Sequence, residues 1–172
     1  MRVLETERLL LRWVEASDAG FMLQLLNDPD WLRYIGDRGV RTIEDARSYI
    51  ATGPRELYAR LGFGLYMVEL RESGAGVGIC GLVKRDWLED VDLGFAFLPH
   101  GRGQGYAYEA ASATVQHGQA AFGLTRIAAI VAPDNRDSIR LLTRLGFRFE
   151  RTVRHPGETQ EICLMALVRS AD

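Results

Sequence analysis

The residues most able to do chemistry in this chain lie in a glycine-rich segment, residues 99–107, which reads PHGRGQGYA. Its three glycines, Gly101, Gly103 and Gly105, allow a tight turn that exposes successive backbone N–H groups. A segment of helical composition follows at once, and the positive end of a helix dipole adds to the attraction for negative charge. The segment therefore predicts a site for phosphate oxygens, and the ligand it suggests is a pyrophosphate.

Two other interpretations of this segment stay open. A glycine-rich connection between a strand and a helix can serve only as a turn. The glycines also partly imitate the G-x-G-x-x-G fingerprint of dinucleotide-binding domains, which would make the protein a nucleotide-dependent oxidoreductase. Against that class, Tyr108 replaces the third glycine when the motif is counted from Gly103. The preceding elements also read as antiparallel hairpins and not as repeated βαβ units.

The elements around the loop must position it. Apolar patterns predict strands over residues 9–13, 64–70, 77–83, 91–98, 126–132, 147–153 and 161–168. Capping residues and helical patterns predict helices from Ser17 to Asp28-Pro29, from Thr42 to Leu61, over 107–122, and from Pro133 to Gly146. The short apolar strand at 126–132 is typical of one buried on both faces beside a parallel neighbour. We predict a mixed α/β fold with a six- to seven-stranded, mostly antiparallel sheet, one parallel βαβ crossover and flanking helices.

Length and composition limit the class of protein. A chain of 172 residues suits a single domain, residues 1–172, with one sizeable core. Its net charge of −2 gives no bulk attraction to nucleic acid or to an anionic membrane. Lys84 is the only lysine and an arginine follows it, which excludes a Walker phosphate loop and leaves almost no candidate for a Schiff-base enzyme. No signal peptide or membrane-spanning run is evident, so a soluble cytoplasmic protein is expected.

Several motifs occur together in one order along the chain: VDLGFAF at 91–97, RGQGYA at 102–107, Glu109-Ala110, APDN-x-x-S at 132–138 and LGF at 145–147. In this combination the chain resembles the GNAT superfamily of acetyl-CoA-dependent N-acetyltransferases. The opening LETERLLLR at 4–12, with Asp18-Ala19 and Asn27-Asp28-Pro29, is similar to the branch that includes the ribosomal-protein N-terminal acetyltransferases. The resemblance implies direct acetyl transfer through a ternary complex, with no covalent enzyme intermediate and no metal.

The resemblance also assigns residues to the cosubstrate, acetyl-CoA. The family holds the pyrophosphate with the glycine-rich loop, which implies contacts from Arg102, Gly103, Gln104, Gly105, Tyr106 and Ala107. It lays the pantetheine arm along the preceding strand as an extra strand, which implies contacts from Phe95, Ala96, Phe97 and Leu98. Asn135 is expected to hydrogen-bond the same arm, although an asparagine near a helix start also commonly caps the helix.

Acetyl transfer needs a proton acceptor for the amine and is helped by a proton donor for the departing thiolate. Asp92 matches a position where the family often has a glutamate base; its side chain is one methylene shorter, which favours a relay through water. An exposed strand aspartate without a catalytic role is the alternative. Ser138 matches the residue that can protonate the thiolate, and it too can be only a helix cap. A metal site at the acidic residues Asp86, Glu89, Asp90 and Asp92 is not favoured, since no histidine has ligand spacing to them. They could attract a cationic amine, and a solvated loop without such a role is the alternative.

The implied acceptor is a primary amine, on a protein N-terminus or on a small molecule, and the resemblance does not choose between them. A homodimer is expected from the resemblance alone. A module that holds acetyl-CoA for regulation, without turnover, remains the alternative from another class, and turnover with any amine would exclude it.

Overall fold

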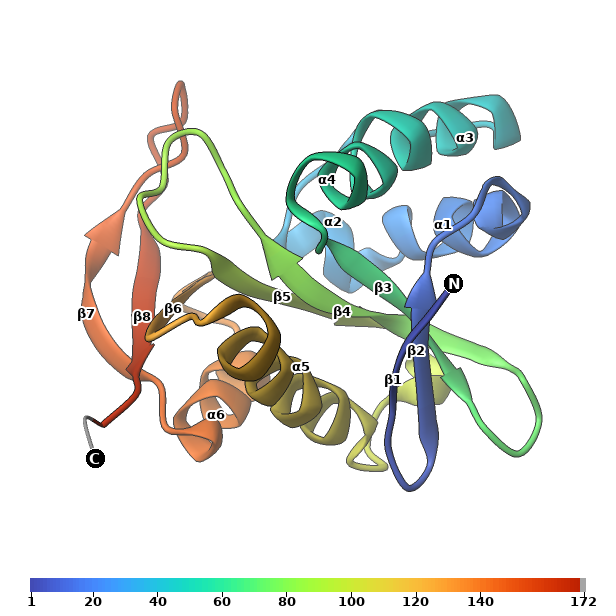
Figure 1. Ribbon diagram of the computed structural model, residues 1–172. Helices are drawn as coiled ribbons and strands as arrows, with labels where there is room; N and C mark the ends of the chain where they lie inside the picture. Colours follow the sequence, from blue (N-terminus) through green and yellow to red (C-terminus); the bar gives the residue numbers. More distant parts are fainter. Residues whose placement is uncertain (171–172) are drawn as a thin grey trace.

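Residues 1–170, the part of the chain that this computed structural model describes, contain one sheet of eight strands in the order β1-β2-β3-β4-β5-β6-β8-β7 (Figure 1). The strands are β1 (Arg2–Glu5), β2 (Leu9–Trp13), β3 (Leu65–Leu70), β4 (Gly76–Val83), β5 (Asp92–Phe97), β6 (Arg126–Val131), β7 (Arg148–Val153) and β8 (Ile162–Val168). Neighbouring strands run antiparallel except β5 and β6, which are parallel. The predicted fold class is confirmed, with eight strands in place of six or seven.

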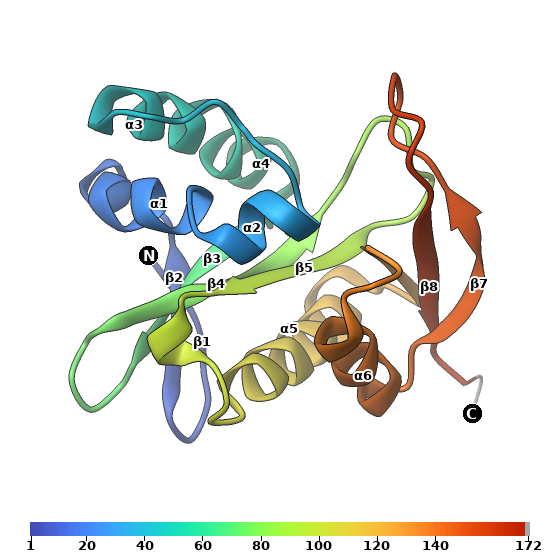
Figure 2. The same cartoon turned by 180° about the vertical axis from the view of Figure 1, so that it is seen from behind.

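Helices cover both faces of this sheet (Figures 1 and 2). One face carries α1 (Ala19–Leu26), α2 (Pro29–Tyr34), α3 (Ile43–Thr52) and α4 (Pro54–Leu61); the other carries α5 (Tyr106–Phe122) and α6 (Arg136–Leu145). A single 3-10 turn, η1 (Ala16–Asp18), precedes α1, and another, η2 (Pro99–Gly101), forms the start of the glycine-rich loop. The parallel crossover from β5 to β6 runs through α5. Within residues 1–170, no helix is long and apolar enough to cross a membrane.

Some element boundaries differ from the sequence prediction. The four-residue strand β1 was not expected; it lies at the sheet edge and forms by pairing with β2, as in Leu4 opposite Leu11. The dipeptide Asp28-Pro29 ends one helix as predicted, and it also begins α2, because Asp28 accepts a hydrogen bond from the amide of Asp30. The helix predicted from Thr42 to Leu61 is two helices, since Pro54 lacks the N–H that would continue α3.

Strand β5 contributes side chains to apolar cores on both faces of the sheet. Leu93 and Phe97 pack in the cluster that includes residues of α5, whereas Ala96 packs against the cluster formed with α1 and α3. Because side chains alternate along a strand, Asp92 shares the second face with Ala96. The strand therefore presents its acidic residue towards the side covered by α1–α4.

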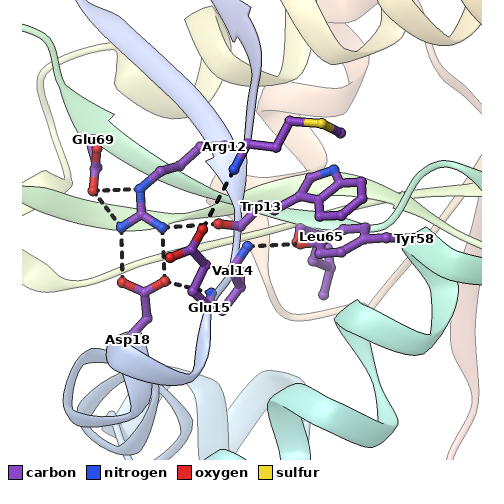
Figure 3. A network of polar contacts seen from close by, with 9 residues as sticks. Arg12, Trp13, Val14, Glu15, Asp18, Tyr58, Leu65 and Glu69 are labelled. Atoms are coloured by element: carbon purple, nitrogen blue, oxygen red, sulfur yellow. Dashed lines mark hydrogen bonds and ion pairs between the residues drawn. The ribbon is translucent and has the colours of Figure 1, made fainter.

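An arginine in β2 connects the sheet edge to the start of the first helix (Figure 3). The terminal nitrogens of Arg12 donate to both carboxylate oxygens of Asp18, at 2.8 and 2.9 Å, and its Nε donates to Glu69 of β3 at 2.9 Å. All three side chains are mostly buried, at 21%, 12% and 17% exposure. Burial by itself would raise the pKa of Asp18, but hydrogen bonds from Arg12 and from the Glu15 amide outweigh it and hold the pKa below its ordinary value.

Replacing this arginine should destabilise the fold in a pH-dependent way. We expect Arg12→Gln to lower the free energy of unfolding by about 2 kcal/mol near neutral pH, between the values for exposed and for buried ion pairs. Since the folded-state pKa of Asp18 lies below its ordinary 3.8, the stabilisation is complete above that value and is lost as pH falls through the folded pKa. Urea unfolding at about pH 7 and about pH 3 measures both effects.

The matched control is Arg47→Gln, because Arg47 forms an exposed pair with Glu44 three residues earlier on α3. That change should cost less than about 0.5 kcal/mol. Equal losses in the two variants, or a loss in Arg12→Gln that persists at low pH, would contradict the role assigned to the Arg12 network.

Candidate active site

Strands β5 and β6 touch at one end and are unpaired along the rest of their length. A single register pair, Asp92 opposite Ala128, and a hydrogen bond of 2.9 Å from the Ala128 amide to the Val91 carbonyl join them among the described residues. Beyond this point one edge of β5 is paired with β4 and the other edge has no strand. Since the backbone groups of alternate residues point to the same edge, the N–H and C=O groups of Leu93 and Phe95 face the split.

A cavity of about 990 Å³ occupies this split and extends beyond both of its ends. Its middle is lined by the two strands, from Asp92 to Phe97 on β5 and from Ala129 to Val131 on β6. One end reaches the glycine-rich loop and α6. The other end reaches α2, α3, the β4–β5 loop and the β7–β8 loop, through Tyr34, Arg38, Tyr49, Arg85 and His155. The cavity is therefore long and runs through the sheet, with open strand edges along its middle.

The glycine-rich loop has the backbone conformation that the sequence predicted. Gly103 and Gly105 have φ values of +72° and +81°, in the left-handed region that favours glycine, and Gly105 directly precedes α5. The side chain of Arg102 is held by the protein itself, through Asp28 at 2.6 Å, Asp30 at 2.9 Å and the Phe97 carbonyl at 2.9 Å. What the loop offers to a ligand is thus mainly its backbone N–H groups and the start of a helix.

The glycine-rich loop is stabilised by contacts from the N-terminal segment that were not predicted from the sequence. Glu109 in the first turn of α5 accepts hydrogen bonds from Thr6 at 2.6 Å and from the Arg8 guanidinium at 2.7 Å. Arg8 also donates to the Gln104 carbonyl at 2.8 Å and lies over the ring of Tyr106. Burial would raise the pKa of Glu109, but these donors hold it below its ordinary value. The motif TERLLLR carried a family signal, yet nothing in its spacing indicated a partner about a hundred residues away.

At the opposite end of the split, Asp92 is buried, with 1% of its surface exposed. Its Oδ1 accepts a hydrogen bond from Nε of Arg85 at 3.1 Å. Burial raises the pKa of Asp92 above its ordinary value, while the charge of Arg85 acts in the opposite direction. A carboxylate with a raised pKa, lining a cavity, is a stronger base than an exposed aspartate. The alternative of an exposed strand aspartate is wrong.

The start of α6 also lines the cavity. Asn135 caps this helix, because its Oδ1 accepts a hydrogen bond of 3.3 Å from the amide of Ser138. Both residues line the cavity as well, so capping and ligand contact are compatible at this position. Arg136, Arg140 and Arg144 follow on the same helix and line the cavity; Arg144 lies 3.9 Å above the ring of Tyr108. Positive charge therefore gathers beside the glycine-rich loop.

Two residues predicted to bind the cosubstrate do not line the cavity. Leu98 is buried in the core beside α1, and its amide donates to Val77 of β4, so it faces away from the split. The Gln104 side chain bonds within the loop, to the His100 carbonyl and the Tyr106 hydroxyl. The other predicted contacts do line it: Phe95, Ala96, Phe97, Arg102, Gly103, Gly105, Tyr106, Ala107 and Asn135, together with Asp92 and Ser138.

The predicted acidic cluster does not form a patch in the cavity. Asp90 pairs with Arg126 at 2.8 Å, and Asp92 pairs with Arg85. Asp86 and Glu89 are exposed and lie outside the cavity lining. The hypothesis that four carboxylates attract a cationic amine is therefore wrong, because arginines from other parts of the chain neutralise two of them and the other two face solvent.

A split sheet with a phosphate-suited loop at one end and a buried carboxylate at the other is an arrangement suited to a long, phosphorylated ligand in an extended form. Comparison with known proteins agrees with this interpretation. Residues 8–148 match the family model described as an acetyltransferase (GNAT) domain, and the chain belongs to this family of N-acetyltransferases, which use acetyl-CoA.

Individual relatives cover most of the chain. YoaA, an uncharacterized N-acetyltransferase of Bacillus subtilis (strain 168), is 31% identical over 88% of this chain and 86% of its own length. A GNAT-family acetyltransferase structure from Bacillus anthracis is 28% identical, covers 98% of both chains and has a TM-score of 0.79. The fold is also shared with RimL, a ribosomal L7/L12 α-N-protein acetyltransferase solved in complex with coenzyme A, at 18% identity, full coverage of both chains and a TM-score of 0.83.

Proposed function

We propose that this protein transfers the acetyl group of acetyl-CoA directly to a primary amine in a ternary complex. The observation that carries the proposal is the split between β5 and β6, which joins the glycine-rich loop to the buried carboxylate of Asp92 through one continuous cavity. Both substrates can then meet inside the sheet. Holding two reactants in a fixed geometry removes much of the entropic barrier to their reaction.

The residues along the cavity suit the successive parts of acetyl-CoA. The backbone N–H groups of residues 102–107 and the start of α5 suit the pyrophosphate, with Arg136 and Arg144 as further positive charge. The unpaired edge of β5 at Leu93 and Phe95 suits the amide groups of the pantetheine arm, as one strand pairs with another. A backbone N–H on this edge can also stabilise the negative charge that develops on the thioester oxygen.

Asp92 is the proposed proton acceptor. Its Oδ1 is held by Arg85, whereas no described residue donates a hydrogen bond to its Oδ2, which leaves that oxygen for a water molecule. The water would take the proton from the amine and pass it to the carboxylate, as expected for an aspartate with a short side chain. Ser138 is the proposed donor to the departing thiolate, and its effect should be small because a thiolate is already a tolerable leaving group.

The test is direct. The purified protein is mixed with acetyl-CoA and a panel of amines: amino acids, short peptides with free N-termini, and polyamines. Release of coenzyme A thiol and mass spectrometry of the acetylated product report turnover. We expect amine-dependent thiol release, with one acetyl-CoA and one amine consumed for each coenzyme A released, and no acetylated form of the enzyme itself. Tight binding of acetyl-CoA with no turnover on any amine would overturn the proposal in favour of a regulatory module, and failure to bind acetyl-CoA would overturn the cavity assignment itself.

A further inference from the structure

The end of the cavity beyond Asp92 contains two arginines with unused hydrogen-bond donors. Arg85, in the β4–β5 loop, uses Nε for Asp92, and no described residue accepts a hydrogen bond from its two terminal nitrogens. Arg38, between α2 and α3, forms no side-chain hydrogen bond or ion pair with any residue in the part of the chain that the structure describes. Both line the cavity.

The charges of Arg85 and Arg38 both act on His155 and on Tyr49. His155, on the β7–β8 loop, lines the cavity and packs on Trp87 of the β4–β5 loop, at 4.8 Å between ring centroids. The two loops lie side by side in both views (Figures 1 and 2). Burial lowers the pKa of His155, and the charges of Arg85 and Arg38 lower it further against the opposing charge of Glu158. Burial raises the pKa of Tyr49 on α3, and the charges of the same two arginines partly offset this rise.

Among the described residues, no carboxylate that lines the cavity is free to balance these charges; Asp86, Glu89 and Glu158 lie outside the lining. Every carboxylate that lines the cavity has an arginine within ion-pair distance among the described residues: Asp28, Asp30, Asp92, Asp134 and Asp137. The Arg85–Asp92 pair is neutral overall, so Arg38 is left as a positive charge with no carboxylate partner in the cavity lining. A polycationic acceptor would be repelled here, whereas a carboxylate on the acceptor would complete the charge balance.

We propose that the acceptor is a primary amine whose own molecule carries a carboxylate, bound by the terminal nitrogens of Arg85 and by Arg38. This inference rests on the proposed acetyl transfer and names its acceptor class. A guanidinium binds a carboxylate through two parallel hydrogen bonds, which fixes orientation as well as affinity. Because Arg85 also holds Asp92, a carboxylate on Arg85 places an amine a few bonds away beside the proposed proton acceptor. Free amino acids and peptides with an acidic residue next to the N-terminus share this chemistry.

Matched acceptors test the proposal. One arm compares leucine and glutamate with leucinamide and glutamic acid diamide; a second compares peptides beginning Ala-Asp with peptides beginning Ala-Asn; spermidine is the polyamine probe. In the free amino acids, the carboxylate makes the amine more basic, so the amide would react faster if the site ignored the carboxylate. In one of the two arms, we expect kcat/KM to be roughly tenfold or more higher for the acceptor with the carboxylate than for its amide. The arm that shows this preference identifies whether the carboxylate belongs to a free amino acid or to an acidic side chain of a peptide.

Arg38→Gln should reduce this preference to within about threefold and leave the KM for acetyl-CoA unchanged. Arg47→Gln removes the same charge outside the cavity and should leave the preference intact. Equal or faster reaction of the amide member in both arms, or of spermidine, would overturn the inference while the transfer itself upholds the proposed function. A preference that survives Arg38→Gln would overturn the role of Arg38. If the protein binds acetyl-CoA but transfers acetyl to no amine, both the acceptor inference and the proposed function are overturned.

Discussion

Asp92→Asn is expected to lower kcat for acetyl transfer by roughly a hundred- to ten-thousand-fold, the usual scale of a lost general base. Asparagine keeps the shape of the side chain and a hydrogen-bond acceptor for Arg85, but it cannot take a proton. Affinity for acetyl-CoA should change by less than about threefold, because Asp92 lies at the end of the split opposite the glycine-rich loop. Thiol release gives kcat, and calorimetry with acetyl-CoA gives Kd.

The pH profile provides a second readout of the same variant. A base works only when it is deprotonated, so wild-type kcat should fall as pH drops through the pKa of Asp92, which burial raises above the ordinary aspartate value. In Asp92→Asn this acid limb should disappear along with most of the activity. The residual rate should still depend on pH in the alkaline range, where the acceptor amine loses its proton.

The control is Asp90→Asn, the same chemical change two residues earlier. Asp90 lies outside the cavity lining and pairs with Arg126, so its loss should affect stability slightly and kcat by less than about twofold. Wild-type turnover in Asp92→Asn across the pH range would show that another group accepts the proton or that the amine arrives neutral.

Gly103→Val should weaken acetyl-CoA binding by about a hundredfold or more, as expected for the loss of one or two hydrogen bonds to charged phosphate oxygens. Gly103 has a φ of +72°, a conformation that a β-branched residue disfavours. The loop backbone would therefore shift, and its N–H groups would no longer point at the phosphate oxygens. No atom lies within 4 Å of an added Cβ there, so the valine would meet no clash and the effect would come from the backbone. Calorimetry on folded protein measures the effect.

Gly74→Val is a closely matched control for this change. Gly74 has the same φ of +72° and the same open space around an added Cβ, but it lies in the β3–β4 turn, outside the cavity lining. Both variants therefore carry similar backbone strain, and both should lower the melting temperature by a similar amount. Only Gly103→Val should raise the Kd for acetyl-CoA. Equal affinities in the two variants would remove the phosphate-binding role of the loop.

The sequence by itself determined the features that depend on a few neighbouring residues. The glycines predicted a tight turn before a helix, and it forms with Gly103 and Gly105 in the left-handed region; capping by Asn135 was given as the alternative to ligand contact, and Asn135 does cap α6. The apolar segment at 126–132 predicted a buried strand beside a parallel neighbour, and residues 126–131 of it form β6. These signals can be read because backbone sterics, capping and side-chain alternation act within one turn of a helix or a few residues of a strand.

The tertiary structure decided which charges meet and which face of the site they occupy. Four acidic residues close together in sequence suggested one negative patch, yet the chain brings Arg126 to one of them and Arg85 to another, and leaves the other two exposed to solvent. Glu109 finds its partner in Arg8, 101 residues earlier. Sequence spacing contains no information on such pairs, because ion pairing and desolvation depend on distances in space that only the packed sheet and helices set.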